Sequence, residues 1–197
     1  MARRTIRFVR SHYYHIYNRG ARHRSVFLDD TDFRNALQAL KSYSSRYHIA
    51  IIAYCLMPNH YHWLIRQDGE ISARYLMQYV FNGYVKGFNA RHQSTGTLFE
   101  GPYHARLVDR DDYLRHLCRY IHANPVRHGF ATAPELWPYS NYMEWIGQRP
   151  GTLVDCNFIQ THFPDVEQYT ASVYAYLQGR NAMPTELQRY LHDLDAA

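Results

Sequence analysis

Two histidines, His60 and His62, stand one residue apart at the start of an apolar run. In an extended strand, side chains at positions i and i+2 share a face, so the two imidazoles would project together while Tyr61 and Trp63 face the other way. Imidazole is a common metal ligand, and a strand holds two of them rigidly. The pair therefore predicts half of a metal site, unless both are simply polar residues on the solvent side of a half-buried strand.

A helical pattern over residues 111–124 carries the next candidates. Tyr120 and Asn124 are four residues apart and share one face of this helix. A tyrosine there is by default a core residue, whereas an asparagine where an apolar residue is expected needs a polar partner. Pro125 disfavours a helical conformation for Asn124, so we expect a break at this helix end. His122 lies away from Tyr120 on the helix and is expected to be a surface or structural residue.

Strands and helices alternate in a recognisable order around these residues. The sequence predicts strands near 11–17, 48–55, 60–66 and 103–108, and amphipathic helices after Asp29 and Ser72. The order strand, helix, strand, strand, helix, strand is typical of the split βαβ arrangement. We therefore expect an α+β fold whose antiparallel sheet carries both helices on one face and leaves the other face open for chemistry.

The second predicted helix has two features of its own. Its inner stripe is expected to include Tyr75, Leu76, Tyr79 and Val80, among others. Glycines at positions 83 and 87 either let another element approach this helix closely or simply weaken it, and close packing against the sheet is the commoner reason. Beyond residue 130 the chain is irregular, with helical patterns near 156–162, 165–177 and 184–194.

Composition limits the class of protein. A chain of 197 residues with 46% hydrophobic and 20% charged residues fits one domain with an appendage. No apolar run approaches the roughly 18 residues of a membrane span, so we expect a cytoplasmic protein without a membrane segment. The three cysteines lack the spacing of a zinc knuckle or a disulfide framework and are expected to be reduced.

Charge and aromatic content favour a nucleic acid as the partner. The formal net charge is +5 at pH 7, and the chain has 19 tyrosines. Arginine suits bidentate phosphate contacts, and tyrosine offers stacking faces for unpaired bases. A basic chain alone is weak support, because many soluble proteins share this property.

Two separated motifs resemble a known family. Met-Pro-Asn-His-Tyr-His at residues 57–62, followed by Tyr-Ile-His-Ala-Asn-Pro at residues 120–125, resembles the HUH single-tyrosine transposases. Within them the sequence is most similar to the REP-associated tyrosine transposases. The resemblance covers about residues 13–130, with further similarity at 96–99, 107–109 and 137–140.

This resemblance implies a site and a reaction. It implies that residues 1–130 form the transposase domain, with 131–197 as a helical extension packed on it. His60, His62 and Asn124 would bind Mg²⁺ or Mn²⁺, and Tyr120 would be the nucleophile. The enzyme would cleave and rejoin single-stranded or hairpin DNA, with repetitive extragenic palindromes as the expected substrate, through a 5′-phosphotyrosine intermediate. The arginines expected to contact phosphate are Arg22, Arg24, Arg106, Arg119 and Arg127.

Some features depart from the family, and two other functions stay open. Tyr61 is more polar than the usual aliphatic residue, and Glu100 and Pro102 replace Gln and Arg. A module that binds hairpin DNA or structured RNA without cutting it is one alternative. A nuclease that uses activated water is another. The resemblance to the REP-associated tyrosine transposases implies a monomer rather than a homodimer, located in the cytoplasm at the nucleoid.

Overall fold

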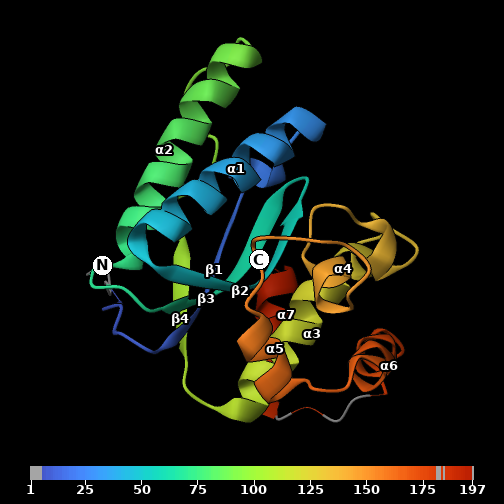
Figure 1. The fold of residues 1–197 in the computed structure, drawn as a ribbon. Helices are drawn as coiled ribbons and strands as arrows, with labels where there is room; N and C mark the ends of the chain where they lie inside the picture. The colour runs from blue at the N-terminus through green and yellow to red at the C-terminus, as the bar shows by residue number, and fades with distance from the viewer. Residues whose placement is uncertain (1–5, 181–182, 184, 197) are drawn as a thin grey trace.

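A four-stranded sheet lies between two layers of helices (Figure 1). The computed structural model describes residues 6–180, 183 and 185–196. The strands are β1 (Tyr13–Arg19), β2 (Ile49–Met57), β3 (His60–Gln67) and β4 (His104–Val108), in the order β2-β3-β1-β4 and antiparallel throughout. The split βαβ arrangement predicted from the sequence is confirmed.

Helices α1 (Asp30–Tyr47) and α2 (Ala73–Arg91) cover one face of the sheet. As predicted, each begins at a polar cap: the Asp29 carboxylate accepts a hydrogen bond from the Asp32 N–H at 3.1 Å, and Ser72 caps α2. Tyr14, Ile16, Tyr61, Trp63 and Ile65 are among the sheet residues of the apolar core beneath them.

The buried stripe of α2 differs from the predicted one. Tyr75 and Tyr79 are 42% and 45% exposed, and the residues that face the sheet are Leu76, Met77, Val80, Tyr84 and Phe88. The tyrosines were wrongly assigned because they lie beside the true stripe on the helical wheel. Gly83 and Gly87 are also exposed, and a Cβ at either position would meet no atom within 4 Å. Close packing on the sheet is therefore not their role.

The second face of the sheet is covered rather than open. Helix α3 (Asp111–Arg127) packs over β2 and β3. Around it lie α4 (Tyr142–Trp145), α5 (Cys156–His162), α6 (Val166–Leu177) and α7 (Thr185–Ala196), with the short 3₁₀ turns η1 (Ala21–His23) and η2 (Pro134–Leu136) elsewhere in the chain. Residues of α3 to α7 share one hydrophobic cluster with β2 and β3. The expectation of an open face was wrong because these apolar helix faces bury themselves on it. Pro184, at the start of the last predicted helix, lies outside the described residues.

Helix α3 continues past the proline. Pro125 lies inside the helix, and Asn124 is fully buried in helical structure rather than in a break. The helix ends only one turn later, where the His128 N–H donates to the Asn124 carbonyl at 3.0 Å. Packing of this buried turn outweighs the local preference of a residue that precedes proline.

Residues 137–145 bind the outer edge of β2. The Leu56 N–H donates to the Tyr139 carbonyl at 2.9 Å. The Asn141 amide oxygen accepts from the Tyr54 N–H at 2.8 Å, and its nitrogen donates to the Ile52 carbonyl at 2.9 Å. The Trp145 indole N–H donates to the same carbonyl at 3.0 Å. The two bonds to the Ile52 carbonyl lie at the bulge of β2, where the register of the strand pairing shifts between residues 51 and 53.

A buried histidine joins this edge to α6. The two ring nitrogens of His122 lie 2.6 Å from the Tyr169 hydroxyl and 3.0 Å from the Asn141 amide oxygen. Burial lowers the pKa of His122 to about 4, so the ring is neutral and donates Nε2–H to Asn141 while its Nδ1 accepts from Tyr169. The structural role expected for His122 agrees with this placement.

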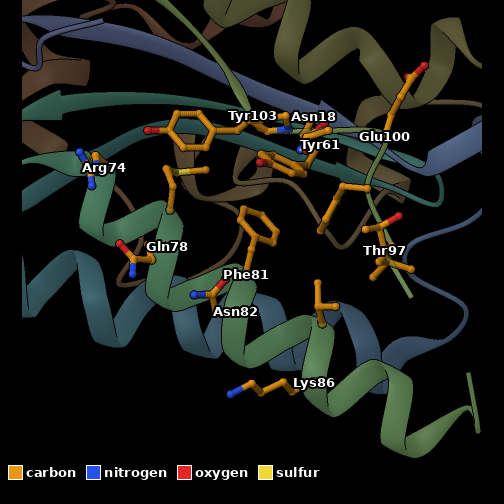
Figure 2. Close-up of a pocket in the computed structure, with 16 residues that line it drawn as sticks. Asn18, Tyr61, Arg74, Gln78, Phe81, Asn82, Lys86, Thr97, Glu100 and Tyr103 are labelled. Atoms are coloured by element: carbon orange, nitrogen blue, oxygen red, sulfur yellow. The ribbon is translucent and has the colours of Figure 1, made fainter. Parts of the chain in front are cut away.

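Two cavities flank the end of the sheet. One of about 670 Å³ lies on the α3 side and is lined by His60 and His62. The other, of about 580 Å³, lies between α2 and residues 97–103 (Figure 2). Cys55, Cys118 and Cys156 are free; the first two are buried, as expected for cysteines packed as small hydrophobic residues, whereas Cys156 is exposed. Of the described helices, none has the length and hydrophobicity needed to cross a membrane.

Candidate active site

Strand β3 presents the two histidines on the α3 side of the sheet. It pairs with both β1 and β2, with His62 opposite Tyr17 and Cys55. The rings of His60 and His62 have their centroids 5.1 Å apart, and His62 is 3% exposed. Tyr61 and Trp63 belong to the core on the opposite face. The alternation predicted from the sequence is therefore correct, and the alternative of a solvent-facing His62 is excluded.

Helix α3 brings the tyrosine and the asparagine to these histidines. The Asn124 amide oxygen lies 3.2 Å from His60 Nε2. The Tyr120 ring meets the His62 ring edge to face, with centroids 5.2 Å apart. Both α3 side chains are 0% exposed. Four residues predicted as one site, from two distant stretches of sequence, thus meet at one point.

The separation of two of the donor atoms, on His60 and Asn124, fits a shared divalent cation. Ligands at about 2.1 Å in octahedral geometry lie about 3.0 Å apart when adjacent, close to the 3.2 Å between His60 Nε2 and Asn124 Oδ1. The Asn124 amide nitrogen is buried without a hydrogen-bond partner among the described residues. His60 Nδ1 lies 2.8 Å from the Asn59 amide oxygen, which orients the ring. Imidazole nitrogens with an amide oxygen suit Mn²⁺, and Mg²⁺ where water completes the shell.

His62 is held in its neutral form by its surroundings. Burial, followed by the charges of His60, His15, His128 and Arg127, lowers its pKa well below the usual value. A neutral imidazole keeps the lone pair that a metal requires.

His15 is a buried partner of His62 whose role was left open by the sequence, in which either His12 or His15 could face a site. Its Nε2 lies 3.1 Å from His62 Nδ1, and its Nδ1 lies 2.7 Å from the Tyr190 hydroxyl of α7. Burial lowers the pKa of His15 to about 3. Of the two histidines in this strand region, only His12 is exposed. The alternation of side chains along β1 could have revealed this placement. Residues 15 and 17 point to the face opposite the apolar Tyr14 and Ile16, which is the face that carries His62.

Two more histidines line the cavity. The His128 ring lies 5.0 Å from the His60 ring, and the His104 ring stacks on Tyr17 at 5.0 Å with an angle of 13°. From the sequence, His104 on the fourth strand could approach the site, and His128 was the weaker candidate. His128 nevertheless lies in the first turn after α3, beside a candidate ligand.

The five predicted phosphate-binding arginines occupy different places. Arg127 lies beside the candidate nucleophile, with its guanidinium 5.5 Å from the Tyr120 ring centroid. Its Nη1 lies 2.7 Å from the Tyr176 hydroxyl. Arg22 is exposed in η1. Arg24 donates to the carbonyls of residues 97 and 98.

Of the other two arginines, Arg106 packs against the extension and Arg119 contacts a residue of its own helix. The Arg106 guanidinium lies 4.1 Å from the Tyr190 ring centroid and 3.4 Å from the Glu186 carboxylate. Arg119 Nη1 lies 3.1 Å from His116 Nδ1, and burial lowers the pKa of Arg119. Arg127 therefore lies beside the central residues of the site, where it contacts Tyr120, whereas Arg119 lies among the helices.

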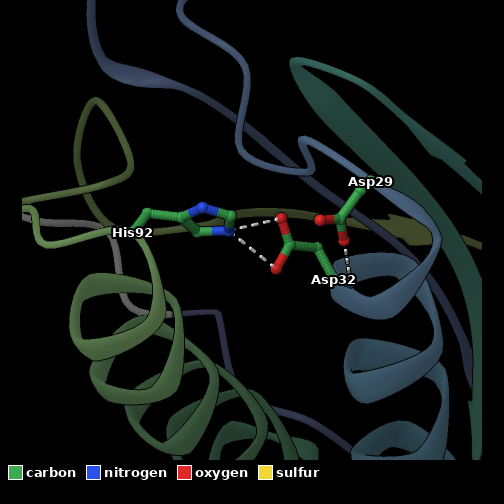
Figure 3. Close-up of side chains that lie close together, drawn as sticks. All are labelled: Asp29, Asp32 and His92. Atoms are coloured by element: carbon green, nitrogen blue, oxygen red, sulfur yellow. Dashed lines mark hydrogen bonds and ion pairs between the residues drawn. The ribbon is translucent and has the colours of Figure 1, made fainter.

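A separate acidic cluster lies at the ends of α1 and α2 (Figure 3). Potential ligand atoms of Asp29, Asp32 and His92 lie within 4.8 Å of one another. Arg91 pairs with both carboxylates and lies 2.6 Å from Asp32. The Arg91 hydrogen bond also lowers the pKa of Asp29. Because this guanidinium already supplies the positive charge, the cluster acts as an ion-pair link between the two helices.

Comparison with known proteins decides the family. The family model described as "Transposase IS200 like" matches residues 8–124. The chain belongs to this family. A REP-associated tyrosine transposase of Haemophilus influenzae is 28% identical over 123 residues, which are 57% of this chain and 70% of the relative.

The fold of this IS200-like transposase matches that of a solved relative. The structure of a REP-associated tyrosine transposase bound to a REP hairpin superposes with a TM-score of 0.59 at 20% identity, over 79% of this chain and 94% of the other. The resemblance drawn from the two motifs is thus confirmed. The family match contains His60, His62 and Tyr120 and ends at Asn124, so the extension lies outside it.

Proposed function

We propose that this IS200-like transposase cleaves and rejoins single-stranded or hairpin DNA through a 5′-phosphotyrosine at Tyr120. His60, His62 and Asn124 would hold one divalent ion, Mn²⁺ or Mg²⁺. Residues 1–130 would form the catalytic domain and residues 131–197 an extension that supports it. The observation that best supports this proposal is the 3.2 Å distance between His60 Nε2 and Asn124 Oδ1, with the Tyr120 ring packed against His62 beside them.

The residue types account for each step. A bound divalent ion supplies Lewis-acid polarisation of the scissile phosphate. The Tyr120 oxygen loses its proton and bonds to phosphorus, while the bond from phosphorus to the 3′ oxygen breaks and that oxygen takes up a proton. The number of phosphoester bonds is unchanged, so a 3′-OH can reverse the reaction without ATP. His15 acts as a positioning residue, since its Nε2 accepts the His62 Nδ1–H when the other His62 nitrogen faces the ion.

The burial of Tyr120 sets a condition on the reaction. Its side chain is 0% exposed, so a phosphate reaches the hydroxyl only after neighbouring side chains move. Arg127 is exposed at the same place, with its guanidinium over the Tyr120 ring, and is the best placed of the five arginines to contact the incoming phosphate. Arg22, at the surface in η1, is the second, and Arg24, Arg106 and Arg119 already hold other residues.

Hairpin DNA of the repetitive extragenic palindrome type is the proposed substrate. The support is the family, and the fact that the solved relative is bound to such a hairpin. We propose that the protein acts at the nucleoid as a monomer, because His60, His62, Tyr120 and Asn124 of one chain already lie together.

The test is the formation of a covalent adduct. The protein is incubated with Mn²⁺ or Mg²⁺ and with hairpins that carry an unpaired flank and a label at either end, and the products are separated on denaturing gels. Tyr120→Phe is the test variant. Tyr113→Phe is its matched control, because it removes another buried hydroxyl from the same helix.

The proposal predicts an adduct that retains the DNA 3′ of the cut, forms with the control and is absent with Tyr120→Phe. Release of free 5′-phosphate without an adduct would instead identify activated water as the nucleophile. Binding without any cleavage in either metal would identify a non-cleaving hairpin-binding module. Either result would overturn the tyrosine mechanism.

A further inference from the structure

The second cavity forms a groove along α2, on the opposite side of β3 from the histidines. One wall is α2, where Arg74, Gln78, Asn82 and Lys86 follow one another at intervals of four residues and are all exposed. The other wall is residues 97–103, with Tyr61 of β3 (Figure 2). We name this cavity the α2 groove. The polar row is about 18 Å long at 1.5 Å per residue, enough for several nucleotides at about 3.4 Å per stacked step.

The inner surface of the α2 groove is aromatic. The Phe81 ring points from α2 towards the sheet and stacks on Tyr61, with centroids 4.6 Å apart and an angle of 21°. Tyr103 lies on the opposite wall in Figure 2. Phe81 is only partly buried, so part of its side chain remains exposed beside these stacked rings. Aromatic faces beside polar side chains are the usual means of binding unpaired bases.

A buried hydroxyl in this groove lacks a partner. The Tyr61 side chain is 0% exposed, and its hydroxyl has no hydrogen-bond partner among the described residues. Leaving a buried polar atom unsatisfied costs free energy, about 1–3 kcal/mol. A base that enters the groove carries donors and acceptors that could satisfy it once the side chains that cover the hydroxyl move aside.

The α2 groove and the candidate active site share a wall. Asn18, Glu100, Gly101 and Pro102 line both cavities. The Asn18 amide donates to the Gly101 carbonyl at 3.0 Å and fixes this wall. Glu100 is the acidic residue of the wall, but it is paired with Arg19, so its charge is compensated. A strand that leaves one cavity can therefore enter the other by crossing this short wall.

From these observations we propose that the α2 groove binds the unpaired nucleotides that flank the scissile phosphodiester, a role that rests on the proposed function. Bases stack against Phe81 and Tyr103, and one of them bonds to the Tyr61 hydroxyl. Phosphates follow the α2 row and are bound by Arg74 and Lys86. The groove thus selects hairpins with a single-stranded flank and feeds that strand across residues 100–102 to His60 and His62.

The test compares hairpins that differ only in their flank. Fluorescence anisotropy in EDTA measures binding of one stem without overhang, with an unpaired 5′ flank, or with an unpaired 3′ flank. The variant is Arg74→Ala with Lys86→Ala. The matched control is Lys41→Ala with Arg180→Ala, which removes the same charge from exposed positions outside both cavities. Thermal melts establish that all forms are folded.

The expected result is a loss confined to flanked hairpins. Their affinity falls about tenfold near 0.1 M salt, and the slope of log K against log salt becomes shallower by about 1.4, which is 0.7 for each lost single-strand phosphate contact. The blunt hairpin and the control change less than twofold. If affinity falls for only one of the two flanked hairpins, the result assigns the polarity of the bound strand and supports the proposal.

An equal loss for blunt and flanked hairpins, or no difference from the control, would overturn the proposal. A second measurement is photocrosslinking of a 5-iodouracil series along the flank, read by mass spectrometry. Crosslinks to Tyr61, Phe81 or Tyr103 support the groove, and crosslinks exclusively elsewhere overturn it. Because EDTA prevents metal-dependent cleavage, failure of the adduct assay and failure of this binding assay are separate outcomes.

Discussion

The two faces of β3 carry opposite kinds of side chain on consecutive residues. Tyr61 and Trp63 lie in an apolar core beneath α1 and α2, while His60 and His62 meet polar partners from α3 and β1. The strand is held on both sides by hydrogen bonds to β1 and β2. One rigid strand can therefore place imidazoles accurately on one face because the other face provides the stability.

Because the two faces of β3 differ in this way, stability and chemistry can be altered separately in this molecule. The first face depends on packed volume, which is lost when a large side chain is truncated. The second depends on the protonation and orientation of buried polar groups, which change with pH, metal and single-atom substitutions.

Truncation on the apolar face should have the largest effect on stability. Trp63 is fully buried and stacks on Phe81 with centroids 5.1 Å apart. We expect Trp63→Ala to lower the free energy of unfolding by about 3–5 kcal/mol. Urea denaturation measures this change. Ile65→Val on the same face should cost only about 0.5–1.5 kcal/mol, and a similar loss for both variants would argue against packing as the cause.

Truncation on the polar face should affect metal binding instead. We expect His60→Ala to weaken Mn²⁺ binding at least about 100-fold, or about 2.7 kcal/mol, because it removes a proposed ligand. Isothermal titration calorimetry measures the affinity without any need for catalysis. The control is His104→Ala, which removes an exposed imidazole from the same cavity. Equal affinities for the two variants would show that His60 is not a ligand.

The buried His122 of α3, which lies outside both faces of β3, should make stability depend on pH. His122 has a pKa lowered to about 4 by burial, against about 6.5 when unfolded. Between these values the unfolded chain binds a proton that the folded chain does not, so the free energy of unfolding falls as the pH falls, by up to about 1.4 kcal/mol per pH unit. His122→Phe should reduce this slope, measured by urea denaturation at pH 7, 6 and 5. His12→Phe, at an exposed position, should not, and an unchanged slope in both would contradict the assignment.

The smallest effect is expected on the outer surface of α2. Gly83 and Gly87 are exposed, and an added Cβ meets no atom within 4 Å. Each glycine-to-alanine change should therefore raise the free energy of unfolding by about 0.5–1 kcal/mol, through the backbone entropy of the unfolded chain. Thermal unfolding of the double variant measures the sum. A decrease in stability would reveal a contact of this surface that the described residues do not account for.

Local signals were enough to predict the framework of the fold. The alternation around His60 and His62 fixed the two faces of β3, and Asp29 and Ser72 marked the starts of two helices. These features depend on neighbours within a few residues. The pairing of Asn124 with His60 spans 64 residues and came from the family resemblance and the helical spacing rather than from local pattern alone.

The errors arose where distant packing decides the outcome. Arg106 was predicted to contact phosphate, and nothing near it in the sequence indicated that it packs against Tyr190 and Glu186, about eighty residues later. The helix passed through Pro125 because residues 121–125 are buried. The role of His15 was not assigned because its partner, His62, is on a neighbouring strand 47 residues away. No short window of sequence contains these contacts.

The segment 137–145 has a consequence beyond holding α4 in place. As the outermost strand, β2 would present unpaired N–H and C=O groups, which are a template for strands of other chains. Tyr139, Asn141 and Trp145 occupy several of these groups. A chain shortened before residue 131 would expose them together with an apolar strand, and it would aggregate by edge-to-edge pairing. Residues 137–145 thus protect the edge of the four-stranded sheet from pairing with other chains.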